Sequence, residues 1–146
     1  MSELIKMIKR HEGLRLNSYI CPNGYPTIGY GTKLPLSDFE KTNVKNENKI
    51  TEQEAEFLLK NRLQRAIADI NDKKPFIKNF SKNRKRVIYD MAYQLGVNGL
   101  LNFKRMWAAL EKSEFKDAAY EMINSKWAKT DSPKRAEELA LIMHLG

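Results

Sequence analysis

One long helix is the strongest structural signal in this chain of 146 residues. Apolar residues recur at helical spacing from Ala55 to Ile70, at positions 55, 58, 59, 63, 67 and 70. The preceding stretch, Thr51-Glu52-Gln53-Glu54, has the threonine and glutamate of a capping box at a helix start. A helix of about 20 residues extends roughly 30 Å. We expect a helix of that length to join two small lobes, with a cleft between them.

The sequence differs in character on the two sides of this helix. Strand-like stretches within residues 15–31 flank the turn Pro22-Asn23-Gly24, which predicts a β-hairpin. After Pro75 the apolar residues return to helical spacing throughout. These patterns predict an α+β fold that is mostly helical. A small N-terminal hairpin lobe is joined by the long helix to a C-terminal helical lobe.

We expect residues 1–146 to form a single domain, because this length suffices for one hydrophobic core. The hairpin lobe is predicted to comprise residues 13–50, of which 35–50 are polar and form a loop with at most one short element. The linking helix comprises residues 51–70. The helical lobe is predicted to comprise residues 1–12 together with residues 71–146.

Helix ends are marked by local signals in the C-terminal half. Ser81, Ser113 and Ser132 each precede a stretch of helical periodicity, so we predict that they are N-cap residues. Pro133 suits the first position of the last helix. Gly96 is predicted to end the helix that starts after Ser81.

Charge and cysteine content narrow the classes of function. The net charge of +8 favours polyanionic partners, namely nucleic acid, an anionic membrane or an acidic cell wall, although a lysine-rich surface can also serve solubility alone. A single cysteine rules out an internal disulfide and fits synthesis in a reducing cytoplasm. The first residues are too short and too charged for a signal peptide, and no apolar run approaches the roughly 20 residues of a membrane span.

Metal and cofactor chemistry find no support in the motifs. His11 and His144 are isolated and lack the spacing of metal ligands, and no glycine-rich phosphate loop is present. We therefore expect neither a metal nor a cofactor.

The segment from Glu12 to Thr32 is the best candidate for chemistry. Glu12 ends the first helical pattern just before Gly13, and no Asp or Glu occurs between Gly13 and Ser37. A carboxylic acid at a helix end that faces polar groups on a hairpin, here Cys21 and Thr27, suits cleavage of a glycosidic bond. The plainer interpretations are a surface glutamate, a small buried sulfur and an ordinary strand threonine.

A nucleic-acid-binding module is the main interpretation without catalysis. The basic run from Lys82 to Arg86 could contact phosphates, and Tyr93, Trp107 and Trp127 could stack on bases. The same run begins a predicted helix with an apolar face, so a solvated helix surface is the default interpretation.

Several motifs, in a fixed order, indicate a family. They are H-E-G-L-R-L-x-x-Y and G-Y-x-T-I-G-x-G near the N-terminus, I-T-x-x-E-A-E-x-L at the start of the long helix, and then Y-Q-L-G, N-F-K-R-M, A-A, S-K-W and S-P-K-R-A. Together they cover nearly the whole chain. The chain resembles the T-even-phage type of lysozyme, a family of muramidases.

This resemblance implies a catalytic set. The family places a glutamate, then an aspartate or cysteine, then a threonine at the spacing of Glu12, Cys21 and Thr27. Glu12 would be the acid, and Cys21 with Thr27 would lie across the bond and position the attacking group, either as nucleophile or as the holder of a water. Thr32 departs from the pattern, because the best-known member has a histidine there.

The resemblance also implies substrate-binding residues in the helical lobe. Tyr93 and Gln94 match an aromatic–glutamine pair that lines the family's cleft. Arg135 matches an arginine that reaches toward the catalytic glutamate.

The function implied is that of a phage endolysin. It would hydrolyse the β-1,4 bond between N-acetylmuramic acid and N-acetylglucosamine in peptidoglycan, without a nucleic-acid partner and as a monomer. Lacking an export signal, it would remain in the host cytoplasm until a holin permeabilises the membrane, and then act on the cell wall from the periplasm. The alternatives are the basic helical nucleic-acid-binding module and a lytic transglycosylase on the same fold.

Overall fold

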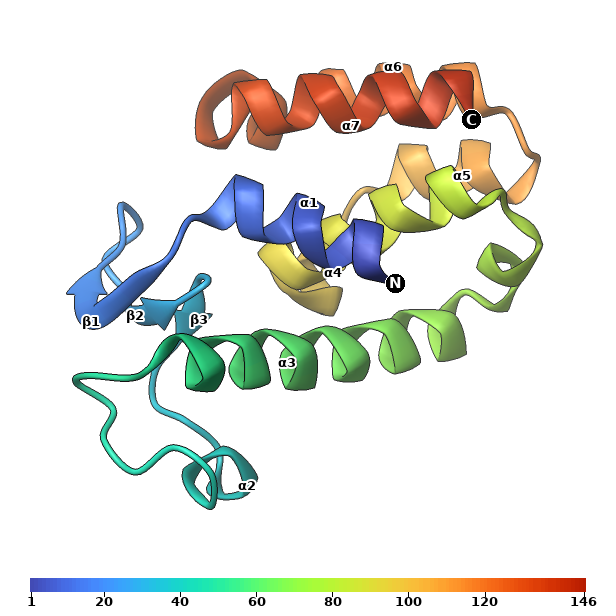
Figure 1. The fold of residues 1–146 in the computed structure, drawn as a ribbon. Coiled ribbons are helices and arrows are strands. Elements are labelled where there is room, and N and C mark those ends of the chain that lie inside the picture. The colour runs from blue at the N-terminus through green and yellow to red at the C-terminus, as the bar shows by residue number, and fades with distance from the viewer. The chain divides into compact units, whose positions relative to one another are not determined.

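The structure, a computed structural model, describes all residues from 1 to 146, and these form two compact units, Met1–Arg65 and Ala66–Gly146. The boundary falls inside the long helix α3 (Glu52–Lys73), which carries the chain from one unit into the other (Figure 1). The helix α1 (Ser2–Glu12) groups with the first unit, and the assignment of residues to three lobe segments stays a prediction.

The predicted long helix is confirmed and continues to Lys73, beyond Ile70. Its capping box is present, because the Thr51 hydroxyl accepts a hydrogen bond from the Glu54 amide at 3.0 Å. The Glu54 carboxylate in turn accepts one from the Thr51 amide at 2.8 Å. The apolar positions 55, 58, 59, 63 and 70 are buried, as the periodicity predicts.

The predicted hairpin is confirmed as part of a three-stranded antiparallel sheet in the order β1-β2-β3. Its strands are β1 (Arg15–Ile20), β2 (Pro26–Gly29) and β3 (Thr32–Lys33). The third strand was not predicted, because two residues are too few to show an alternating pattern. On its other side β1 pairs with residues 48–50, through hydrogen bonds from the Ser18 amide to the Asn48 carbonyl and from the Ile50 amide to the Leu16 carbonyl.

The short element expected in residues 35–50 is α2 (Asp38–Lys41). Ser37 caps it, and the Glu40 side chain closes a second capping box by accepting from the Ser37 amide at 2.9 Å. Glu40 is fully buried and also accepts two 2.8 Å hydrogen bonds from the Arg62 guanidinium. This ion pair holds α2 against α3.

The second unit is helical, as predicted. After α3 it contains a 3₁₀ turn (Pro75–Asn79), α4 (Lys82–Leu101), α5 (Lys104–Glu111), α6 (Phe115–Ile123), a π-helical turn (Trp127–Asp131) and α7 (Pro133–Leu145). The helices α6 and α7 lie side by side (Figure 1).

The predicted helix ends have mixed outcomes. Ser81 is confirmed as a cap, because its hydroxyl accepts from the Arg84 amide at 3.2 Å. Gly96 is confirmed as the end of the first helical segment of α4, because its φ of 76° and ψ of 154° are not helical, and a second segment continues beyond this kink to Leu101. The prediction for Ser113 is wrong: it adopts a left-handed φ of 57°, and Glu114 is the N-cap.

Three of the residues proposed for nucleic-acid contact are engaged within the second unit. Arg84 donates to the carbonyls of Met143 at 2.8 Å and His144 at 3.1 Å, which caps the C-terminal end of α7. Trp107 and Trp127 are each only 3% exposed, so neither indole can stack on a base in this structure.

Candidate functional site

Glu12 is the last residue of α1, which ends as predicted before Gly13 in a conformation with φ 71°. Its carboxylate lies against the backbone between β2 and β3. A Cβ atom at Gly31 would be 2.9 Å from the Glu12 Cδ, and closer still to an Oε1 oxygen. Gly31 also has a φ of 76°, which disfavours a side chain. The bare backbone at Gly31 therefore makes room for the candidate acid.

Tyr19 connects this carboxylate electrostatically to the hairpin. Burial raises the pKa of Tyr19, and the negative charge of Glu12 raises it further, while the Arg15 guanidinium, 4.6 Å from the ring centre, lowers it. The charge of Cys21 also raises this pKa. On the sheet Tyr19 is paired with Thr27. Tyr19 therefore lies near Glu12 and Cys21 and is paired with Thr27 on the sheet, although the sequence did not single it out.

Cys21 begins the turn between β1 and β2 and is half-buried. Its amide donates to the Tyr25 carbonyl at 2.9 Å, and its carbonyl accepts from the Gly24 amide at 2.8 Å. A hydrogen bond from the Tyr25 backbone lowers the pKa of the Cys21 thiol. The Asn23 backbone, the Thr27 hydroxyl and the Lys33 charge act in the same direction, and burial opposes them. A lowered pKa increases the thiolate fraction near neutral pH.

Thr27 lies on β2 and is only 3% exposed. Its hydroxyl donates to the Tyr25 carbonyl at 2.9 Å. The same hydroxyl is close enough to the Cys21 sulfur to lower the pKa of the thiol. The hairpin thus places Cys21 and Thr27 near each other.

The predicted binding residues of the second unit meet where α4 packs against the start of α7. Tyr93 and Gln94 lie on α4, and both are half-buried. The Gln94 amide nitrogen donates to the Ser132 hydroxyl at 2.8 Å. The Gln94 carbonyl oxygen accepts from the Trp127 indole at 3.0 Å.

Arg135 lies in the first turn of α7 and is largely buried. Its Nε donates to the Asp90 carboxylate at 2.9 Å, and Asp90 is fully buried on α4. A buried charge of this kind persists only when it is paired, so the pair fixes the direction of the arginine. Asp90 is a contributor that the sequence analysis missed, because nothing in its local pattern indicates a partner far along the chain.

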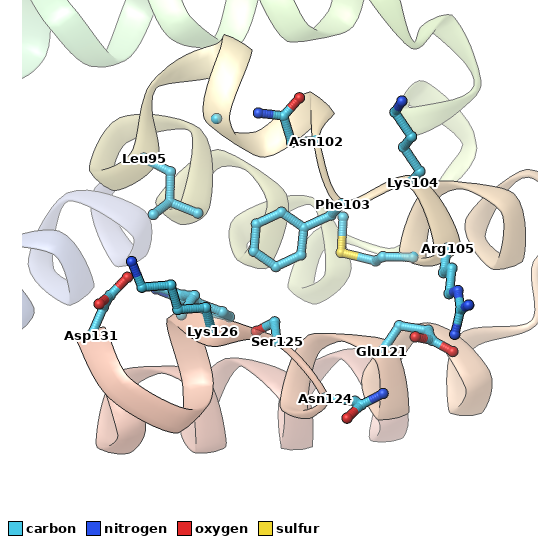
Figure 2. Close-up of a pocket in the computed structure, with 13 residues that line it drawn as sticks. Leu95, Asn102, Phe103, Lys104, Arg105, Glu121, Asn124, Ser125, Lys126 and Asp131 are labelled. Carbon is cyan, nitrogen blue, oxygen red and sulfur yellow. The ribbon is translucent and has the colours of Figure 1, made fainter.

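A pocket of about 560 Å³ lies beside this group within the second unit. Leu95 from α4, Phe103 from the start of α5, and Ser125 and Trp127 line it. Figure 2 shows the Phe103 ring in the middle of the pocket, with Leu95 on one side and Ser125 on another. Charged residues surround it, namely Lys104, Arg105, Glu121, Lys126 and Asp131. Its mixture of apolar walls and polar rim is typical of a ligand site.

The two groups of predicted site residues belong to different units, Glu12, Cys21 and Thr27 to the first and Tyr93, Gln94 and Arg135 to the second. No group of three or more His, Cys, Asp or Glu side chains lies where it could hold a metal ion. No helix has both the length and the apolar character to cross a bilayer.

Comparison with known proteins agrees with the fold and the motifs. The family model described as phage lysozyme matches residues 9–140. Probable T4-type lysozyme 1 of Dictyostelium discoideum is 30% identical over 164 residues, which cover 100% of this chain and 96% of the relative. Probable T4-type lysozyme 2 of the same organism is 27% identical with the same coverage.

A third relative is much longer. The pre-baseplate central spike protein Gp5 of Enterobacteria phage T4 is 29% identical over 160 residues, which cover 98% of this chain but only 28% of that protein. The similarity therefore concerns one part of the spike protein. With the family model matched across residues 9–140, the chain belongs to the phage lysozyme family and is a glycoside hydrolase of the lysozyme type.

Proposed function

We propose that this lysozyme is a phage endolysin that cleaves the β-1,4 bond between N-acetylmuramic acid and N-acetylglucosamine and thereby lyses the host cell. Membership of the phage lysozyme family supports peptidoglycan as the substrate. The observation that carries the proposal is the placement of Glu12. Its carboxylate lies against the bare backbone of Gly31, in the unit whose hairpin presents Cys21 and Thr27.

In this proposal Glu12 is the general acid. It gives its proton to the glycosidic oxygen as the bond to the leaving sugar breaks. Cys21 and Thr27 position the attacking group on the other side of the sugar. In one route the Cys21 thiolate attacks the anomeric carbon, and a water molecule activated by the deprotonated Glu12 then breaks the carbon–sulfur bond and releases the sugar. In the other route the sulfur and the Thr27 hydroxyl together orient a water molecule that attacks the anomeric carbon directly. Both routes benefit from the lowered pKa of the thiol.

Tyr93, Gln94 and Arg135 are proposed to bind the substrate from the second unit. Their support is the matched family motif together with the hydrogen bonds that hold Gln94 and Arg135 in place. The net charge of +8 favours binding to an anionic wall, and this attraction should weaken as salt rises.

The proposed setting is the host cell. The enzyme accumulates in the cytoplasm as a monomer, depends on a holin for passage through the membrane, and then acts on the wall. Holin dependence is tested by expressing the enzyme in host cells with and without the holin and following the turbidity of the culture.

Analysis of the products tests the reaction itself. Purified peptidoglycan is digested and the muropeptides are analysed by mass spectrometry. Hydrolysis predicts reducing N-acetylmuramic acid ends, whereas a transglycosylase would leave anhydro sugars.

The acid role is tested with Glu12→Gln, which keeps the shape of the side chain but cannot deliver a proton. We expect it to lose lysis of purified walls while it melts at the temperature of the wild type. Glu3→Gln on the same helix is the control and should stay active, because Glu3 is exposed near the start of α1. Clearance by Glu12→Gln above a few per cent of the wild-type rate would remove Glu12 from the acid role.

A further inference from the structure

Ser132 occupies a position at which a serine normally caps a helix. It directly precedes Pro133, the first residue of α7, yet its hydroxyl makes no capping hydrogen bond to the first turn. The hydroxyl instead accepts from the Gln94 side-chain amide at 2.8 Å. A serine at an N-cap usually stabilises its helix. Here that contribution is absent, and the hydroxyl holds a side chain of α4.

Trp127 holds the other end of the same amide. Its indole N–H donates to the Gln94 carbonyl oxygen at 3.0 Å. The indole is only 3% exposed and packs edge-on against Phe103, with ring centres 5.9 Å apart. It also begins a π-helical turn, an uncommon element that is frequent at functional sites. The indole is therefore a rigid donor.

These two contacts determine which way the Gln94 amide faces. An indole can only donate, so the oxygen of the amide must lie toward Trp127 and the nitrogen toward Ser132. The amide nitrogen has two hydrogens, and it donates one of them in the hydrogen bond to the Ser132 hydroxyl. The second N–H makes no hydrogen bond within the protein, and Gln94 is half-buried rather than fully enclosed.

We propose that Ser132 and Trp127 are positioning residues that lock the Gln94 amide so that it offers its second N–H to the substrate. The ligand chemistry that fits is an acceptor oxygen of peptidoglycan, such as a carbonyl, carboxylate or hydroxyl oxygen. An N–H group of the substrate does not fit, because the Gln94 oxygen is already occupied by Trp127. This inference rests on the proposed function, in which Gln94 contacts the substrate.

Kinetics of Ser132→Ala test the positioning role. Loss of one oriented hydrogen bond should raise KM roughly 3- to 10-fold and leave kcat nearly unchanged. Ser132→Thr keeps a hydroxyl and should restore the wild-type KM. Ser81→Ala is the matched control, because Ser81 is a true cap of α4 and does not touch Gln94. It should lower the melting temperature and leave KM unchanged.

Gln94→Glu tests the donor. A carboxylate can still accept from Trp127, and the Ser132 hydroxyl can turn to donate to it, so the fold should be retained. The N–H offered to the substrate is lost, and KM should rise. A wild-type KM for this variant would overturn the donor role.

NMR of the side-chain amide separates this inference from the proposed function, since it requires no activity. In ¹⁵N-labelled protein the Gln94 NH₂ group should give two resolved, slowly exchanging signals. These should exchange faster in Ser132→Ala and be restored in Ser132→Thr. Unchanged signals in Ser132→Ala would overturn the locking role even if the enzyme is an endolysin. Lysis by Glu12→Gln, in contrast, would refute the proposed acid role without affecting the conclusion drawn from the Gln94 amide signals.

Discussion

Replacement of Gly31 by alanine probes how the fold positions the candidate acid. A Cβ atom at this position would meet the Glu12 carboxylate, with only 2.9 Å to Cδ. Atoms in normal contact stay roughly 3.5–4.0 Å apart, so the carboxylate must retreat by about 1 Å. Gly24 offers the matched control. Its φ of 87° is similar to the 76° of Gly31, but a Cβ there would meet nothing within 4 Å.

The two variants should lose similar stability and very different activity. Both place an alanine in a left-handed conformation, at a cost of roughly 1–2 kcal/mol in free energy of unfolding. The contact with Glu12 adds little to this in Gly31→Ala, because the end of a flexible side chain can move away. A displacement of about 1 Å at a catalytic group, however, can lower the rate roughly 100-fold, which is about 2.7 kcal/mol of transition-state stabilisation.

The assay pairs thermal unfolding with initial rates of clearance of purified peptidoglycan. We expect melting temperatures of Gly31→Ala and Gly24→Ala within a few degrees of each other, and a rate near wild type for Gly24→Ala alone. Equal rates for the two variants at matched folded fractions would refute the argument that Gly31 is bare to accommodate Glu12.

The remaining predictions concern the buried ion pair, the long helix and the cysteine. Burial raises the pKa of Glu40, but hydrogen bonds and charge from Arg62 outweigh it and lower the pKa to about 2. The pKa of Glu40 in the folded state lies below the ordinary value near 4.3. Ionised Glu40 therefore adds about 3 kcal/mol to the free energy of unfolding above pH 4.3, and this contribution is lost as pH falls toward 2. Arg62→Ala should lower the free energy of unfolding by about 3–5 kcal/mol at pH 7 and by less near pH 2, as measured by urea titration. Leu59→Ala and Leu63→Ala should each lose roughly 2–5 kcal/mol, and melting shifts under about 2 °C at both positions would show that this face is not core. Cys21→Asp should stay active with its pH optimum moved toward acid, since an aspartate ionises about four units below a thiol, while Cys21→Ala should lose most activity. A thiol reagent should inactivate the wild type, with protection by substrate, and an active, stable Cys21→Ala enzyme would exclude the catalytic role.

Local patterns were sufficient for most of the secondary structure. The capping box at Thr51 and the apolar spacing that follows predicted α3, because capping and amphipathic periodicity involve residues only three or four positions apart. The Pro22-Asn23-Gly24 turn predicted the hairpin for the same reason. Ser113 failed as a predicted cap because a cap depends on the backbone conformation as well as on residue type, and its φ of 57° places Glu114 at the N-cap instead.

The sequence by itself determined the long helix, the hairpin beside a lone carboxylate, and the family through its ordered motifs. The tertiary structure decided which side chains meet. Gln94 and Ser132 are 38 residues apart, Asp90 and Arg135 are 45 apart, and no local spacing connects either pair. These hydrogen bonds depend on the path of the whole chain. Folding buries polar groups that are distant in sequence, and a buried polar group is stable only when it is hydrogen-bonded or paired. For that reason the candidate residues could be named from the motif, whereas the contacts that orient them required the fold.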